Sequence, residues 1–356
     1  MEKERNRPRF LRNNSELNKI LRRSTTKYVD AFSSQIKELF FIRNTKFVGI
    51  DKNLVCKGKE FLNFQKRYQK KYAHAFLQWN NTVVKTFTKE IYLEIKTNRN
   101  KDLITREEQK ELSNFTVGVF GMSVGSNISM ILTQSGISNK IFLADFDELD
   151  TSNLNRIIAG IHQIGMNKTV IAARKIYEDN PFAKVYLMKD GLTKINLENL
   201  LRDKKLDCIV EEVDNLVVKI ETRILAMKYK VPVLMITDNG EGVILHVERY
   251  DLGYKKIFNK GIKYWEKFLK SKMTKELIGQ IVLDDIIGGL KMTTTRVISS
   301  SRNVSDGKLV SWAQLGVAAQ YGAVVIVAEI KRIALGIDKQ KYRHLSLFPL
   351  PFLKDY

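Results

Sequence analysis

Between residues 115 and 250, short apolar runs alternate with longer stretches that have helical periodicity. The apolar runs cover residues 115–120, 140–145, 184–188, 206–211 and 231–237. Apolar residues at helical spacing follow the first run from Ile128 onward and recur over 166–179, 196–203 and 216–229. Strands that alternate with helices in this way indicate βαβ units. We therefore predict an α/β fold with a Rossmann-like, doubly wound, mostly parallel sheet.

Different patterns flank this region. On the N-terminal side, apolar residues predict a helix over 29–41, and five aromatic residues at intervals of three or four predict another over 60–76. On the C-terminal side, we predict a strand over 242–250, antiparallel to its neighbour. We expect residues 251–311 to be irregular and to form a lid or partner-binding loop, and residues 312–335 to form a packing helix.

We divide the chain into two domains on these patterns. Residues 1–100 form a mainly helical or mixed addition, which we expect to bind a partner or peptide or to mediate dimerisation, and residues 101–356 form the sheet domain.

Charge is unevenly distributed between these parts. The 356 residues have a net charge of +21, and residues 1–100 hold 23 Lys and Arg against 9 Asp and Glu, while the remainder holds 37 against 30. Such asymmetry indicates either an acidic partner or a solvated basic surface. Lysines beside the aromatic residues of 60–76 are compatible with nucleic-acid binding, but an aromatic stripe at this spacing is more typical of a core face. We therefore do not expect nucleic acid as the partner.

Two cysteines, Cys56 and Cys208, exclude a four-thiolate zinc site and a disulfide framework, so we expect no zinc. No apolar run reaches the ~20 residues that span a bilayer. These features predict a soluble cytoplasmic protein with no membrane partner.

The first predicted strand leads into a glycine turn, which is typical of a phosphate cradle at a helix N-terminus. Gly121, Ser123, Gly125 and Ser126 are its candidate phosphate-binding residues, although Ser123 stands where the dinucleotide fingerprint has its second glycine. The same turn fits the nucleophile elbow of α/β-hydrolases, with Ser123 as nucleophile. An acidic residue at the end of the next strand, Asp145, favours the nucleotide interpretation, because a carboxylate there binds ribose.

Charged and amide side chains follow the ends of two predicted strands. Asp145, Asp147, Asn153, Arg156 and Lys168 come after the second strand, and Asp214 and Asn215 come after the fourth. Parallel strands share one carboxyl edge, so this set predicts a site for a nucleoside triphosphate and Mg²⁺. Helix capping is the structural alternative for Asp147 or Asn153, and exposure on a helix surface is the alternative for Lys168. An oxidoreductase that binds NAD(P) or FAD would need fewer cations.

Residues 142–156, the Gly165–Lys168 segment, and Asp214-Asn215 with Arg223 resemble the ubiquitin-activating-enzyme-like adenylyltransferases, the ThiF/MoeB superfamily. This resemblance implies that the glycine turn and Ser126 hold the phosphates of ATP and that Asp145 binds the ribose. It also implies that Asp147, Asn153, Arg156, Lys168 and Asn215 belong to the nucleotide site, and that Asp214 binds Mg²⁺. Arg99 resembles an arginine that relatives donate across a homodimer interface. The implied catalytic residues are Arg99, Arg156, Lys168 and Asp214.

The chain lacks the Cys-x-x-Cys pairs and the nucleophilic cysteine that many members of this superfamily carry. In this it resembles a bacterial branch without catalytic cysteine, which includes enzymes that mature ribosomal peptides of the microcin C and pantocin type. We therefore expect an ATP-dependent adenylyltransferase that activates a carboxylate of a peptide or small protein, acidic in character. The alternatives are activation of a ubiquitin-like or sulfur-carrier C-terminus, an oxidoreductase, and a binding module without activity.

Overall fold

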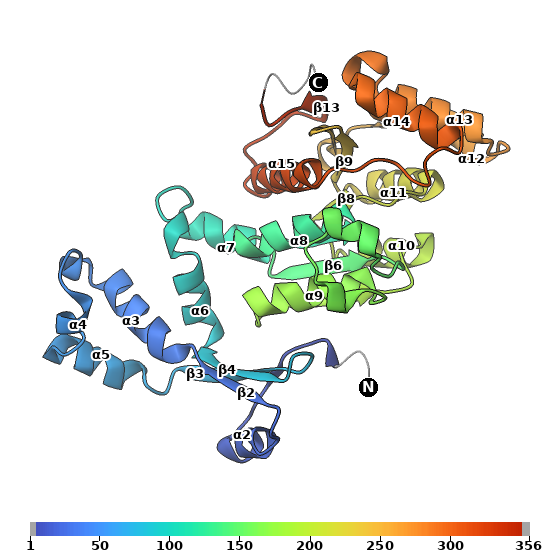
Figure 1. The fold of residues 1–356 in the computed structure, drawn as a ribbon. Coiled ribbons are helices and arrows are strands. Elements are labelled where there is room, and N and C mark those ends of the chain that lie inside the picture. The colour runs from blue at the N-terminus through green and yellow to red at the C-terminus, as the bar shows by residue number, and fades with distance from the viewer. Residues whose placement is uncertain (1–4, 351–356) are drawn as a thin grey trace. The chain divides into compact units, whose positions relative to one another are not determined.

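The computed structural model describes residues 5–350, which form two compact units. The N-terminal unit comprises residues up to 109 together with 173–183, and the larger unit comprises 110–172 and the chain from 184 onward. Figure 1 shows the elements of both units coloured along the chain. None of the helices within the described range is long and apolar enough to cross a membrane.

A seven-stranded sheet forms the centre of the larger unit. Its order is β13-β10-β9-β8-β5-β6-β7. The strands are β5 (Val117–Phe120), β6 (Lys140–Ala144), β7 (Lys184–Met188), β8 (Cys208–Glu211), β9 (Val233–Asn239), β10 (Gly242–Glu248) and β13 (Tyr342–Leu347). The five strands from β5 to β9 run parallel, while β10 and β13 are antiparallel to their neighbours. The predicted doubly wound, mostly parallel sheet is thus confirmed, as is the antiparallel strand after β9.

Helices connect these strands and cover the sheet. They are α7 (Arg106–Asn114), α8 (Val124–Gln134), α9 (Lys168–Asp179), α10 (Lys194–Arg202), α11 (Leu216–Tyr229) and α15 (Gly316–Ala334), with short 3₁₀ turns η3 (Thr151–Asn155) and η4 (Ile161–Gln163). Val119 of β5 faces α8, whereas Phe120 packs with residues of α10 and α11. Successive strand residues point to opposite faces, so these two helix layers lie on opposite sides of the sheet. The predicted packing helix over 312–335 begins later than expected, at Gly316, and packs on α8, β9 and β10.

The chain changes its direction of winding at β5, which has β6 on one side and β8 on the other. Ligands of open α/β sheets bind at such a switch point, outside the carboxyl ends of the strands. Gly121, which follows β5, donates its amide to the carbonyl of Ala144 at 2.8 Å, and the amide of Glu212 donates to Phe120 at 2.7 Å. The ends of β6, β5 and β8 therefore meet where the sequence predicts the site.

Residues 251–311 are mostly helical, so the expectation of an irregular segment was wrong. They contain η5 (Tyr250–Leu252), β11 (Lys256–Ile257), β12 (Lys260–Gly261), α12 (Ile262–Leu269), α13 (Lys275–Ile281), a π-helical turn η6 (Val282–Ile287), η7 (Leu290–Met292) and α14 (Thr295–Ser305). The physical reason is burial: Trp265 and Phe268 of α12 form a core with Leu216 and Ile220 of α11. That contact fixes the segment on the sheet domain.

The N-terminal unit contains a four-stranded sheet of order β1-β3-β4-β2. Its strands are β1 (Arg9–Phe10), β2 (Lys27–Asp30), β3 (Tyr72–Leu77) and β4 (Thr82–Phe87), and its helices are α2 (Asn14–Leu21), α3 (Phe32–Arg43), η1 (Thr45–Phe47), α4 (Lys52–Val55), α5 (Lys59–Tyr68), α6 (Lys89–Lys96) and η2 (Asn98–Asn100). The helix predicted over 29–41 therefore starts at Phe32, because Val29 belongs to β2.

The single helix predicted over 60–76 was also wrong. Its first part is α5, but Tyr72 and Phe76 lie on β3, which pairs with β4. A spacing of four residues satisfies a helix and also keeps two residues on one face of a strand, so the aromatic period did not reveal the break. The rings of Phe61 and Phe64 contact Phe40 of α3 at centroid distances of 5.3 Å, which makes this part of the stripe a core face.

Candidate nucleotide site

The turn after β5 requires glycine at its first position. Gly121 has a φ of +92°, and a Cβ atom there would lie 2.3 Å from the carbonyl oxygen of Glu212. At Gly125, a Cβ would lie 2.9 Å from Cγ1 of Val119. The first glycine thus allows the end of β5 to pass close to the end of β8, and the second allows α8 to pack closely on the sheet.

Asp145 connects the turn to the end of β6. Its carboxylate accepts hydrogen bonds from the backbone amides of Met122 and Asp147. Burial raises the pKa of Asp145, while these amide bonds and the charge of Lys168 act in the opposite direction. A carboxylate held in this way retains lone pairs for the hydroxyl groups of a ribose.

Arg156 reaches the same turn from the loop after η3. Its Nε donates to Oγ of Ser123 at 2.8 Å, and its Nη1 donates to Oδ1 of Asn155 at 2.9 Å. Burial lowers the pKa of Arg156, and the nearby charges of Asp238 and Asp214 oppose that effect. The guanidinium therefore contacts the glycine turn and lies within electrostatic range of two carboxylates.

This contact bears on the hydrolase alternative, which requires a histidine to activate Ser123. The hydroxyl of Ser123 accepts from Arg156, and within residues 5–350 it has no hydrogen bond with a histidine. His162 is exposed, and His246 and His344 stack on each other in β10 and β13. The geometry does not support a nucleophile elbow.

Lys168 is buried at the first turn of α9, and its Nζ donates to Oδ2 of Asp147 at 2.8 Å. Its backbone amide donates to the carbonyl of Asp147 at 2.9 Å. A buried lysine whose ammonium is held by a half-exposed carboxylate can exchange that partner for a phosphate of a ligand.

The remaining predicted residues of the turn and its loop serve local structure. Buried Ser126 donates its hydroxyl to the carbonyl of Ser123 at 3.0 Å. Buried Asn153 accepts from the amide of Asp150 at 3.1 Å and closes the cap of η3. Both side chains fix the backbone around Arg156.

Asp214 and Asn215 follow β8, as predicted, but they have different surroundings. Asp214 is exposed, and in the described part of the chain its carboxylate forms no hydrogen bond or ion pair. Asn215 caps α11, accepting from the amides of Val217 at 2.9 Å and Val218 at 3.2 Å. The structure thus gives Asn215 a helix-capping function that the sequence interpretation did not assign to it.

Arg99 lies apart from this set in the chain. It belongs to η2 of the N-terminal unit and is exposed. Its contribution across a dimer interface stays a prediction.

Sequence reasoning missed Asp238, near the end of β9. Its Oδ2 accepts from Nε2 of Gln314 at 3.1 Å, while Oδ1 is buried without a partner in the described structure. Burial raises the pKa of Asp238 to about 6, against the effects of Gln314 and Arg156. An acidic residue at the end of a predicted parallel strand was a usable signal, the same one that identified Asp145.

The acidic residues present suit Mg²⁺, which takes one or two carboxylates together with substrate phosphates. Burial lowers the pKa of Arg156, and the charges of Asp214 and Asp238 both act to raise it. The buried Oδ1 of Asp238 has no hydrogen-bond partner in the described structure. No group of three His, Cys, Asp or Glu able to hold a metal ion occurs in residues 5–350.

Cys208 is not a nucleophile. It is fully buried in β8, and burial raises the pKa of its thiol well above the ordinary range. A thiol in such surroundings stays protonated and unreactive, so Cys208 serves as a core residue.

A Rossmann-like sheet with a glycine turn at the switch point, a carboxylate after the second strand and buried cations defines a nucleotide-binding domain. The chain belongs to the ThiF family, whose model matches residues 96–345. The matched residues run from the end of α6 into β13, so they include the glycine turn and the strand ends around it.

Individual relatives share parts of this chain. The "Uncharacterized protein MT1398" of Mycobacterium tuberculosis is 32% identical over 314 residues, which are 87% of this chain and 40% of that protein. A "Probable molybdopterin-synthase adenylyltransferase" of Porphyra purpurea is 37% identical over 111 residues, 31% of this chain and 28% of that protein. The chain therefore spans less than half the length of these relatives.

Among solved structures, the Escherichia coli tRNA N6-threonylcarbamoyladenosine dehydratase in complex with AMP has a TM-score of 0.50 and 17% identity. The match covers 68% of this chain and 96% of that one. This likeness concerns the fold alone.

Proposed function

We propose that this protein binds ATP with Mg²⁺ at the switch point and adenylates a carboxylate of a peptide or small protein, in the maturation of a ribosomal peptide. The observation that carries the proposal is the position of Arg156. Its guanidinium contacts Ser123 of the glycine turn and interacts electrostatically with both Asp214 and Asp238. A cation at that point neutralises charge that develops on the α-phosphate and on the leaving pyrophosphate.

In the proposed reaction, a carboxylate oxygen of the substrate attacks the α-phosphorus of ATP. The bond from that phosphorus to the oxygen bridging to the β-phosphate breaks, and pyrophosphate leaves with the electron pair. Asp145 positions the ribose, and the amides of the glycine turn bind phosphate oxygens. Lys168 leaves Asp147 to contact the phosphates. Asp214 and Asp238 would hold Mg²⁺, which supplies further charge neutralisation.

A peptide substrate is favoured over a ubiquitin-like protein because the site lacks a reactive thiol. Cys208 is buried, and Cys56 belongs to the N-terminal unit. The acyl adenylate would therefore pass to a nucleophile other than a cysteine of the sheet domain. Activation of a ubiquitin-like or sulfur-carrier C-terminus is the second candidate, and the family match supports both.

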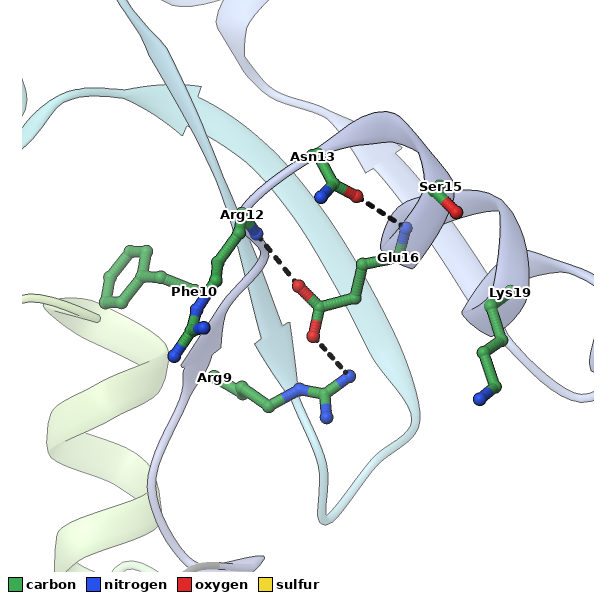
Figure 2. Close-up of a pocket in the computed structure, with 7 residues that line it drawn as sticks. All are labelled: Arg9, Phe10, Arg12, Asn13, Ser15, Glu16 and Lys19. Atoms are coloured by element: carbon green, nitrogen blue, oxygen red, sulfur yellow. Dashed lines mark hydrogen bonds and ion pairs between the residues drawn. The ribbon is translucent and has the colours of Figure 1, made fainter.

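The N-terminal unit contributes a basic hollow of about 530 Å³ beside β1 and α2 (Figure 2). Arg9, Arg12 and Lys19 line it, and its one carboxylate, Glu16, is already paired with Arg9 at 3.1 Å. A surplus of positive charge suits acidic residues of a precursor peptide. We propose that this unit binds such a peptide, and that the enzyme is a homodimer with Arg99 at its interface.

Isotope exchange between pyrophosphate and ATP tests the proposal. Exchange should require the peptide substrate and Mg²⁺, and mass spectrometry should show the peptide gaining an adenylate or its downstream product. Arg156→Ala should abolish exchange without changing the fold, as judged by circular dichroism. Exchange supported only by a protein with a Gly-Gly terminus would favour the second candidate, and nicotinamide binding without ATP binding would contradict both.

A further inference from the structure

A second hollow lies in the larger unit, next to Asp214. Its volume is about 340 Å³, within the roughly 300–1,000 Å³ typical of ligand pockets. Most of its lining is apolar: Leu216 and Val217 from α11, Met273 before α13, Ile278 of α13, and Val282 and Ile286 of the π-helical turn. Asp214 and Asn215 belong to its polar wall. The hollow therefore adjoins the carboxylate assigned to the adenylation site.

Part of this lining does not contribute to the core that holds the helical segment in place. The segment is fixed on α11 by a buried core that includes Trp265, Phe268 and Ile281. Met273 and Ile278 are outside this core and remain 36% and 37% exposed. Apolar side chains that line a concavity and are not needed to close the core are available to a ligand.

The segment that supplies Met273 and Ile278 to the hollow is strongly basic. Residues 251–280 contain eight lysines against three acidic residues, a net charge of +5 out of the +7 carried by residues 101–356. Lys270 and Lys272 precede Met273 in the chain; both are exposed and form no ion pair in the described structure. Lys219, which lies in the lining, is instead paired with buried Glu211 at 3.2 Å. The free positive charge thus lies on the segment that carries Met273.

We propose that this hollow binds an apolar side chain near the carboxyl end of the substrate peptide, and that the basic segment 251–280 binds acidic residues of the same peptide. This inference rests on the proposed adenylation, because it is the position beside Asp214 that makes the bound end the one to be activated. Charge complementarity selects an acidic peptide over a second copy of this chain, whose matching segment is equally basic. The apolar lining selects a side chain that a nucleic-acid backbone does not offer.

Binding selection from a pool of short random peptides with free carboxyl ends tests the proposal without ATP. The full chain should retain peptides that have an apolar residue near the carboxyl end and acidic residues before it. Ile278→Asp should weaken binding of a selected peptide about tenfold or more, the factor expected for burying one large apolar side chain. The double variant Lys270→Glu, Lys272→Glu should lose the preference for peptides with acidic residues. Its loss of affinity for a selected acidic peptide should be larger at low salt than at high salt, because salt screens the charges. Lys184→Glu, on exposed β7, is the charge control.

Selection that is unchanged in Ile278→Asp, or a wild-type chain that retains no peptide above background, would overturn the proposal. So would binding of a single-stranded oligonucleotide that depends on Lys270 and Lys272 but not on Ile278. Ile278 is partly exposed, so its variant should fold, and an unchanged melting temperature verifies this. Pyrophosphate exchange is measured separately. If the protein catalyses exchange but selects no peptides, only the proposed peptide binding in the hollow is contradicted. If it selects peptides but catalyses no exchange, only the proposed adenylation is contradicted.

Discussion

The guanidinium of Arg156 and the hydroxyl of Ser123 are joined by a 2.8 Å hydrogen bond across 33 positions of the sequence. This bond holds Arg156 through its Nε, while its Nη2 has no hydrogen-bond partner within residues 5–350. The charges of Asp214 and Asp238 also act on the pKa of this side chain. Arg156 thus contacts the glycine turn, lies within electrostatic range of the carboxylates of Asp214 and Asp238, and retains a donor for an anionic ligand.

The first prediction concerns this link. Arg156→Lys keeps the charge but loses the fork of donors, so kcat for pyrophosphate exchange should fall by about 10²-fold or more. Ser123→Ala removes only the bond that orients the guanidinium, and we expect a loss of about tenfold. The measurement is exchange kinetics with varied ATP. Equal activity of Arg156→Lys and wild type would show that the guanidinium fork is not used.

The second prediction concerns the turn. Gly121→Ala places a Cβ 2.3 Å from a carbonyl oxygen at a φ of +92°, which should destabilise the fold by about 2–5 kcal/mol. Gly279→Ala, inside α13 with open space around it, should be neutral or stabilise by up to about 1 kcal/mol. Urea unfolding compares the two. A Gly121→Ala variant as stable as wild type would mean that the ends of β5 and β8 separate easily.

The parallel part of the sheet was predictable because its signals are local. Strands β5, β6, β8 and β9 are largely buried apolar runs, and the helix predicted over 216–229 coincides with α11. Such runs arise because strands covered on both faces bury every side chain. Strand β13 was missed because it is an edge strand whose residues are only partly buried, so its composition is not apolar enough to stand out.

The helical segment 251–311 was missed although part of its signal was present. Ile262, Trp265 and Phe268 recur at helical spacing with charged residues between them, but the helix has only eight residues, so this amphipathic pattern was overlooked. The burial of these rings depends on α11, a contact distant in sequence that no local window contains. In the N-terminal unit, α3 was predicted nearly correctly, because Phe32, Ile36, Leu39 and Phe40 all face its core.

The positions of the candidate residues at the strand ends were predictable from the sequence, whereas the contacts of each side chain were not. Asp145, Arg156 and Lys168 lie around the switch point as their positions after strands implied. Arg223, which formed part of the family resemblance, is fully buried between Glu211 at 2.7 Å and Glu248 at 2.6 Å. Whether a polar residue caps a helix, closes a buried ion pair or faces a ligand depends on tertiary contacts that spacing does not contain.

The third prediction concerns pH. His246 and His344 stack with centroids 4.1 Å apart, and Nε2 of His246 is 2.6 Å from the carbonyl oxygen of Ile286. Burial lowers the pKa of both, and the nearby charges of Arg223 and Lys219 add to the effect at His246. The unfolded chain therefore takes up protons near pH 6.5 that the folded chain does not.

The free energy of unfolding should consequently be fully retained above about pH 6.5 and decline as the pH falls below it. Each histidine contributes up to about 1.4 kcal/mol per pH unit to this decline. His344→Phe preserves an aromatic ring beside His246 but cannot be protonated, so its stability should decline less steeply with acidification. Urea unfolding of both proteins between pH 8 and pH 5 measures the difference. If the free energies of unfolding of the two proteins fall in parallel with pH, the decline does not come from protonation of His344.

The fourth prediction separates the two carboxylates near Arg156. Desolvation of the partly buried Asp238 raises the pKa of its carboxyl to about 6, so the folded protein holds its proton to a higher pH than the unfolded chain does. The contribution of Asp238 to the free energy of unfolding is thus fully present near pH 4, and it is lost as the pH rises through about 6. Above that pH, the ionised carboxylate costs on the order of 3 kcal/mol, which Asp238→Asn should restore.

Asp214→Asn is the matched control, because Asp214 follows the neighbouring strand and senses the same arginine but is exposed. If both carboxylates serve the proposed Mg²⁺ site, each variant should lower pyrophosphate exchange and raise the Mg²⁺ concentration needed for half-maximal rate. Only Asp238→Asn should also gain stability above pH 6, and this gain should vanish near pH 4. An exchange rate in Asp238→Asn equal to that of wild type, combined with the stability gain, would make Asp238 a structural residue of β9 and leave Asp214 as the one carboxylate at the metal.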